Sequence, residues 1–152
     1  MKIISISGAH RSIGKTTLAR RLKATLDQAA VIVKVGHGRI KEKDEILLHS
    51  VEKLSDLIAT LKVPYLLIES NQAHEVAPPD FSIYIDALDK PPKASAAKAR
   101  ERADIIIDES LEEAQVTSVL SQKAFFSRRI AQRVQETLMD FHRDFLERKR
   151  LQ

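Results

Sequence analysis

The sequence contains no cysteine, and this absence removes several chemistries at once. Disulfide bonds, thiolate metal sites and cysteine nucleophiles are all excluded. A chain that needs no disulfides also fits a reducing compartment, so we expect a cytoplasmic protein.

Aromatic residues are scarce, at 5% of the chain with no tryptophan. Single-stranded nucleic acids are usually held by aromatic side chains on which the bases stack. This scarcity argues against a nucleic-acid partner, although the net charge is +4 and the sequence pI is about 9.4. Much of the positive charge lies in the last thirty or so residues. That basic segment is either a solvated helix face or a surface for an acidic partner or a nucleotide.

Long apolar runs are also missing, and none approaches the roughly 20 residues that a membrane span requires. The first seven residues are too short for a signal-peptide core, so we expect no targeting segment and no membrane association. With 152 residues, 43% of them hydrophobic and 30% charged, the chain fits one folded domain over residues 1–152.

Short apolar segments rich in β-branched residues alternate with segments of helical periodicity. This alternation predicts an α/β fold of three layers, with a mostly parallel sheet flanked by helices. The capping-box spacing of Ser110 and Glu113 predicts a helix start near Leu111. Strands are predicted over 2–7, 31–35, 65–68, 81–85 and 104–107, and helices over 16–29, 44–61, 94–103 and, as a long basic C-terminal helix, from about 122 to 150.

The segment Gly8-Ala-His-Arg-Ser-Ile-Gly-Lys-Thr-Thr17 follows the first strand and opens the first helix. Phosphate-binding loops need glycines for tight turns, and backbone N–H groups at a helix N-terminus for the anion. The segment therefore predicts a P-loop that binds ATP or GTP. Lys15 is expected to act catalytically on the β- and γ-phosphates, and the Thr16 hydroxyl to hold Mg²⁺. The predicted nucleotide-binding residues are Gly8, Ser12, Ile13, Gly14, Lys15, Thr16 and Thr17.

The first glycine is displaced from the standard pattern G-x-x-x-x-G-K-[ST]. That pattern places a glycine five residues before Gly14, where this chain has Ala9, and the glycine occurs one residue earlier, at Gly8. The preceding strand and the following amphipathic helix nevertheless supply the context that a phosphate loop requires.

Glu69 directly follows the predicted strand at 65–68, and parallel sheets bind ligands at the carboxyl ends of their strands. We expect Glu69 to hold Mg²⁺ with Thr16, directly or through water, and to position a water for hydrolysis. His10, Arg11 and His37 are further candidates for contact with phosphate or substrate. Three other features leave alternatives open. His74 and Glu75 could form a metal site with His37, but their spacing is not that of metal ligands. The segment 86–90 is a candidate for reading the base, although it lacks the N-K-x-D signature. The basic residues of 93–102 form either a lid over the phosphates or a solvated helix face.

The spacing of Gly8 and the Gly-Lys-Thr segment resembles the loops of dethiobiotin synthetase and the cobyrinic acid amidation enzymes, which belong to the SIMIBI class of P-loop proteins. The chain also resembles the small MobB family, which serves molybdenum-cofactor guanylylation. Val33-Lys-Val-Gly-His37 stands where MobB-like chains have a strand ending in Lys-His. Leu67-Ile-Glu-Ser70 stands where they have Val-Glu-Gly, with Ser70 replacing the glycine. The resemblance covers roughly residues 1–110.

The resemblance implies a MobB-like accessory protein with slow ATP or GTP hydrolysis, acting in molybdenum cofactor biosynthesis. One alternative is a small-molecule kinase or a dethiobiotin-synthetase-like ATP-dependent enzyme. Another is a non-catalytic, nucleotide-dependent protein whose partner is a second copy of this chain or a cofactor-maturation protein. In that case the apolar stripe of the last helix would pack across a two-fold axis instead of on the sheet.

Overall fold

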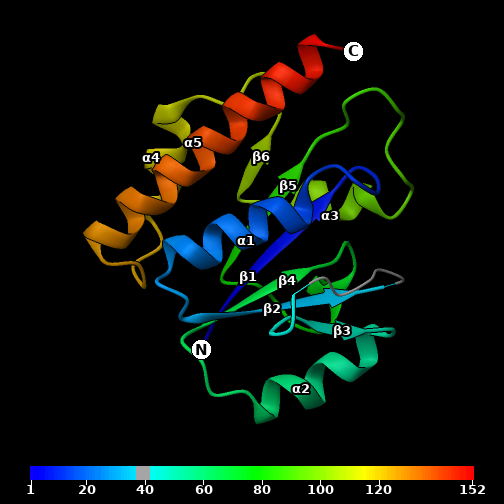
Figure 1. The fold of residues 1–152 in the computed structure, drawn as a ribbon, viewed down its shortest axis with the longest axis vertical. Coiled ribbons are helices and arrows are strands. Elements are labelled where there is room, and N and C mark those ends of the chain that lie inside the picture. Colours follow the sequence, from blue (N-terminus) through cyan, green and yellow to red (C-terminus); the bar gives the residue numbers. More distant parts are fainter. Residues whose placement is uncertain (37–41) are drawn as a thin grey trace.

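A computed structural model describes residues 1–36 and 42–152 of the chain. In this part of the chain, six strands form one fully parallel sheet in the order β3-β2-β4-β1-β5-β6 (Figure 1). The α/β prediction is therefore confirmed. The strands are β1 (Lys2–Gly8), β2 (Ala30–Val35), β3 (Ile46–Leu48), β4 (Tyr65–Glu69), β5 (Phe81–Ile85) and β6 (Ile105–Ile107), and the helices are α1 (Lys15–Thr25), α2 (Leu54–Thr60), α3 (Ala96–Arg102), α4 (Glu113–Ser121) and α5 (Arg128–Arg150), with short 3₁₀ turns at Val51–Lys53 and Ala73–Glu75.

Helices cover both faces of the sheet because the central strands are apolar on both sides. On β5, Phe81 and Ile83 belong to the core shared with α1, α4 and α5, while Tyr84 packs with α3 on the opposite face. On β4, Leu66 packs toward α2. Figure 1 shows α1, α4 and α5 together on one side of the sheet and α2 on the other.

The apolar stripe of α5 packs within the chain, against α1 and the sheet, and not across a two-fold axis. Val134, Leu138, Phe141 and Phe145 are all buried in this core. The helix begins at Arg128, later than the predicted residue 122, because the Ser127 side chain caps it by accepting a hydrogen bond from the Ile130 N–H at 3.2 Å. The long C-terminal helix is thus an integral part of one face of the fold.

The predicted helix over 44–61 is wrong in its first half. Residues Ile46–Leu48 form β3, which pairs in parallel with β2, and Ser50 caps the 3₁₀ turn that leads into α2. Glu45 holds the start of this segment, because its buried carboxylate accepts from the Arg20 guanidinium at 2.6 Å. The helical spacing of the leucines is real, but hydrogen bonds to the edge of β2 outweigh local periodicity.

Two smaller boundaries also differ from the predictions. The capping box at Ser110 does not form, because the Ser110 hydroxyl donates to Asp108 at 2.8 Å, and α4 begins only at Glu113. Helix α1 ends at Thr25 instead of 29, since Asp27 and Gln28 adopt left-handed conformations that turn the chain into β2. Across the described ranges, none of the helices combines the length and apolarity needed to cross a membrane.

Candidate functional site

The segment Gly8–Thr17, which runs from the end of β1 to the first turn of α1, is held in shape by both local and distant contacts. The Gly8 N–H donates to the Asn71 side-chain oxygen at 2.9 Å, and the Asn71 amide donates back to the Gly8 carbonyl at 3.0 Å. Ile13 is fully buried and anchors the middle of the loop. Ser12 and Gly14 both have positive φ angles, of 60° and 113°, which turn the chain sharply into α1.

The first turn of α1 has backbone donors that the described part of the chain leaves without acceptors. Gly14 is the N-cap residue and contributes no side-chain cap. In the described part of the chain, none of the N–H groups of residues 14–17 donates a hydrogen bond to the protein. Such a helix end carries the positive pole of the helix dipole and attracts an anion.

Thr16 and Glu69 meet at the carboxyl ends of the two central strands. The Thr16 hydroxyl donates to Glu69 Oε1 at 2.7 Å, although the residues are 53 positions apart in the sequence. The other carboxylate oxygen, Glu69 Oε2, is buried and has no partner within residues 1–36 and 42–152. Burial raises the pKa of Glu69, while the Thr16 hydrogen bond and the charges of Lys34 and Lys15 oppose the rise.

Lys15 lies among other cations at the start of α1. Burial lowers the pKa of Lys15, the carboxylate of Glu69 raises it, and Lys93, Lys34 and Arg11 lower it further. A cation that is both partly desolvated and surrounded by like charges is costly in the free protein. A bound polyanion would remove that cost, so the electrostatics of the loop favour an anionic ligand.

A cavity of about 1000 Å³ opens between this loop and the ends of β2 and β4. Its size reaches the upper range of small-molecule sites. The cavity extends from the loop to His49 and Ser50, which follow β3, and to Gln72, which follows β4. Among the residues that the structure describes, six cationic side chains line it against two carboxylates, which again favours an anion. The cations are Arg11, Lys15, Arg20, Lys34, Lys93 and Arg148, and the carboxylates are Glu52 and Glu69.

The structure brings the central sequence-predicted residues together around one cavity. Of the further candidates, Arg11 and Lys93 also line this cavity, whereas His37 lies outside the described residues. His74 lies instead at a small pocket beside Ser5 on another part of the sheet. No group of three or more histidine or acidic side chains positioned for a metal ion occurs within the described ranges.

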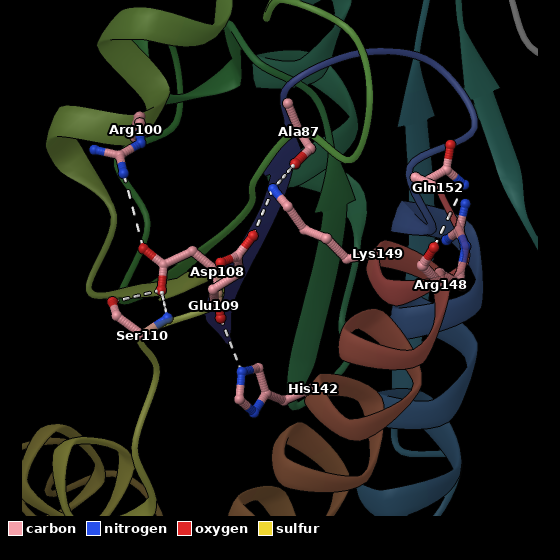
Figure 2. A network of polar contacts seen from close by, with 9 residues as sticks. All are labelled: Ala87, Arg100, Asp108, Glu109, Ser110, His142, Arg148, Lys149 and Gln152. Carbon is pink, nitrogen blue, oxygen red and sulfur yellow. Dashed lines mark hydrogen bonds and ion pairs between the residues drawn. The ribbon is translucent and has the colours of Figure 1, made fainter.

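The basic residues on α3 itself lie outside the described lining of the cavity, although Lys93, which precedes this helix, belongs to it. The cavity lining, as far as the structure describes it, does not include residues 86–90. Arg100 pairs with Asp108 at 3.9 Å, away from the cavity (Figure 2). The base-reading role of residues 86–90 stays a prediction.

Sequence reasoning missed Asn71, Lys34, His49 and Arg148. Asn71 follows Glu69 by two residues at the end of β4, so the strand-end argument used for Glu69 could have found it. Arg148 carries no such signal, because its place at the cavity depends on how α5 packs beside α1. Neither the protein-family models nor the curated proteins that were searched give a match to this chain.

Replacing Glu69 with glutamine is expected to stabilise the ligand-free protein at neutral pH. Glutamine can still accept the Thr16 hydrogen bond but carries no buried charge, which relieves about 1 kcal/mol or more. The folded-state pKa of Glu69 lies above its usual value of 4.5, so folding favours the protonated form. Wild-type stability therefore falls as pH rises from about 4.5 through the folded-state pKa.

The advantage of Glu69→Gln should grow over that same pH window and vanish below it. Thermal unfolding of both proteins between pH 4 and 8, without nucleotide or Mg²⁺, measures this difference. An exposed carboxylate changed in the same way, Glu101→Gln, serves as the matched control and should show no such trend. A Glu69→Gln variant that is less stable than wild type at pH 8 would contradict the expectation.

Proposed function

We propose that this chain is a P-loop nucleotide-binding protein of the SIMIBI class, which binds MgATP or MgGTP and hydrolyses it slowly. The observation that carries the proposal is the convergence of Lys15, the free N–H groups of residues 14–17 and the Thr16–Glu69 pair on one cationic cavity. These are the groups that a triphosphate and its metal require. The further proposal of a MobB-like role in molybdenum cofactor biosynthesis rests on the sequence resemblance.

The residues at the end of β4 fit a magnesium ion. Glu69 Oε2 is a buried carboxylate oxygen without a partner among the described residues, and the Thr16 hydroxyl lies beside Oε1 of the same side chain. Mg²⁺ commonly takes only one or two protein oxygens and completes its shell with phosphate and water. When bound there, the ion would neutralise phosphate charge. Its arrival also gives a physical reason for the burial of an unpaired carboxylate oxygen.

The phosphates would be held by the helix end and by Lys15. The N–H groups of residues 14–17 would donate to the phosphate oxygens, and Lys15 would add a full positive charge. For hydrolysis, Glu69 is the best-placed carboxylate to orient a water molecule, and Arg11 lines the same cavity. One carboxylate would then serve both the ion and the water, which agrees with slow turnover.

A second candidate function is phosphoryl transfer to a small molecule. It is favoured by the extension of the cavity past the phosphate loop to Lys34, His49 and Gln72. An acceptor bound there would attack the terminal phosphorus through an oxygen. The bond to the leaving nucleoside diphosphate would break, and the acceptor proton would pass to a base such as His49 or to water.

Binding of ATP, GTP, ADP and GDP to the full chain, with and without Mg²⁺, tests the proposal by calorimetry. We expect a triphosphate to bind in the micromolar range or tighter, with weaker binding when Mg²⁺ is removed. Preference for GTP would favour the MobB-like role, and phosphate transfer to an added small molecule would favour the second candidate. Absence of binding by all four nucleotides would reject the nucleotide-binding function.

A further inference from the structure

The C-terminal end of α5 lies against the back of the phosphate loop. Arg148 donates from Nη1 to the Ile13 carbonyl at 3.2 Å and from Nη2 to the Ser12 carbonyl at 3.3 Å. These two residues stand 135 and 136 positions before Arg148 in the sequence. The same side chain lines the cavity, so one guanidinium joins the last helix to the ligand site.

Neighbouring contacts hold this end of α5 in place. Lys149 donates to the Ala87 carbonyl at 3.0 Å and pairs with Glu109 at 3.3 Å, as Figure 2 shows. About two helical turns earlier, the His142 ring contacts the Asp108 carbonyl at 2.8 Å. The position of Arg148 is therefore set by the loops that follow β5 and β6.

Phe141 fills the space directly behind Gly14. A Cβ atom added at Gly14 would lie 3.0 Å from Phe141 Cζ and 3.5 Å from Arg148 Nη1. Helix α5 thus touches the loop at the residue that caps α1. The loop cannot move outward without displacing this helix.

The carbonyl groups of Ser12 and Ile13 present an electrostatic problem at an anion site. Carbonyl oxygens carry partial negative charge, and any that turned toward a bound phosphate would repel it. A guanidinium has a rigid planar fork of donors that can hold two neighbouring acceptors at once. Arg148 uses that fork on both carbonyls and keeps them directed at itself.

We propose that Arg148 is a positioning residue, which holds the Ser12 and Ile13 carbonyls so that the N–H groups of residues 14–17 are pre-organised for phosphate. This inference rests on the proposed nucleotide-binding function. It assigns a role to the basic C-terminal helix, since the end of α5 completes the phosphate loop from outside its sequence segment. Pre-organisation raises affinity by removing the cost of ordering the loop when the ligand binds.

The test compares wild type with Arg148→Ala and Arg148→Lys, and uses Arg150→Ala as the matched control. Arg150 lies on the same helical turn, where it is ion-paired with Glu147 at 3.1 Å. Affinity for tripolyphosphate and for the Mg²⁺-bound triphosphate is measured by calorimetry. We expect Arg148→Ala to weaken both by about tenfold. The lysine variant should recover only part of the loss, because it lacks the fork, and the Arg150 control should match wild type.

A second readout distinguishes positioning from general stability and needs no ligand. In the free protein, the amide NMR resonances of Ile13, Gly14 and Lys15 should shift or broaden in Arg148→Ala. The amide resonances of residues at the C-terminal end of α1 should not shift. If Arg148→Ala fails to fold, Arg148→Lys decides the question through the same two measurements.

Two results would overturn the inference, and they differ from failure of the proposed function. If the Arg148 variants bound with the same affinity as wild type and their loop amide resonances did not shift, the loop would need no such support. If affinity fell only in step with the melting temperature, and amide resonances shifted along all of α1, Arg148 would merely stabilise the fold. If wild type itself bound neither tripolyphosphate nor nucleotide, the proposed function would fail and this inference with it.

Discussion

Replacing Lys15 with alanine is expected to weaken binding of the Mg²⁺-bound triphosphate by about 100-fold. A charge-assisted hydrogen bond to phosphate is worth about 3 kcal/mol in a partly desolvated site, which corresponds to this factor. Lys15 lies at the first position of α1, inside a cationic cavity and beside Glu69. Titration calorimetry of wild type and variant with the preferred nucleotide gives the two dissociation constants.

The free Lys15→Ala protein should be at least as stable as wild type. Burial already lowers the pKa of Lys15, so its charge is a cost until an anion arrives. Lys62→Ala, which changes an exposed lysine away from the cavity, is the matched control and should bind as wild type does. Equal affinity in wild type and Lys15→Ala would refute the phosphate-binding role of the loop.

Replacing Gly8 with alanine is expected to destabilise the fold by about 2 kcal/mol and to weaken nucleotide binding with it. A Cβ atom at Gly8 would lie 2.5 Å from Cγ2 of Ile13. Ile13 is fully buried, so neither group can move without disturbing the core. Overpacking of this kind costs about 1 to 3 kcal/mol. Urea unfolding gives the stability change, and calorimetry gives the affinity.

Two further variants show whether the clash with Ile13 is the cause. The double variant Gly8→Ala with Ile13→Ala should be destabilised by less than the sum of the two single variants, because the clash between the two side chains disappears. Ala9→Gly moves a glycine to the position of the standard pattern and should cost about 1 to 2 kcal/mol, from the extra backbone entropy that glycine loses on folding and from the buried methyl group that is removed. A fully additive double variant would rule out the proposed contact.

The close approach at Gly8 also explains the displaced glycine of the motif. In this chain Ala9 is buried, and its N–H and carbonyl are bonded to Ile85 and Lys93. Its methyl group packs with Tyr84 and the alanines of α3. The position that tolerates no side chain is therefore Gly8, where Ile13 folds back over the end of β1.

Most of the sheet could be predicted from the sequence, because its central strands are short, apolar and bounded by clear turn signals. The segments 2–7, 31–35, 65–68, 81–85 and 104–107 all contain strands. The exception is β3, whose residues Ile46–Leu48 share helical periodicity with the segment that follows. A three-residue edge strand has no pattern of its own, since it exists through its pairing with β2.

The site divides in the same way between local and distant determinants. Lys15 and Thr16 could be identified because the loop and the helix that follows it are contiguous in the sequence. Glu69 could be identified because strand ends meet at one edge of a parallel sheet. Arg148 could not, since nothing local distinguishes it from the neighbouring basic residues of α5.

By itself, the sequence determined the α/β class, the order of the central elements and the loop from Gly8 to Thr17, because each depends on residues close together in the chain. Only the tertiary structure decided that Thr16 donates to Glu69, that Asn71 braces Gly8 and that Arg148 holds the back of the loop. Those contacts join residues separated by between 53 and 136 positions, and chain packing alone brings such residues within hydrogen-bond distance.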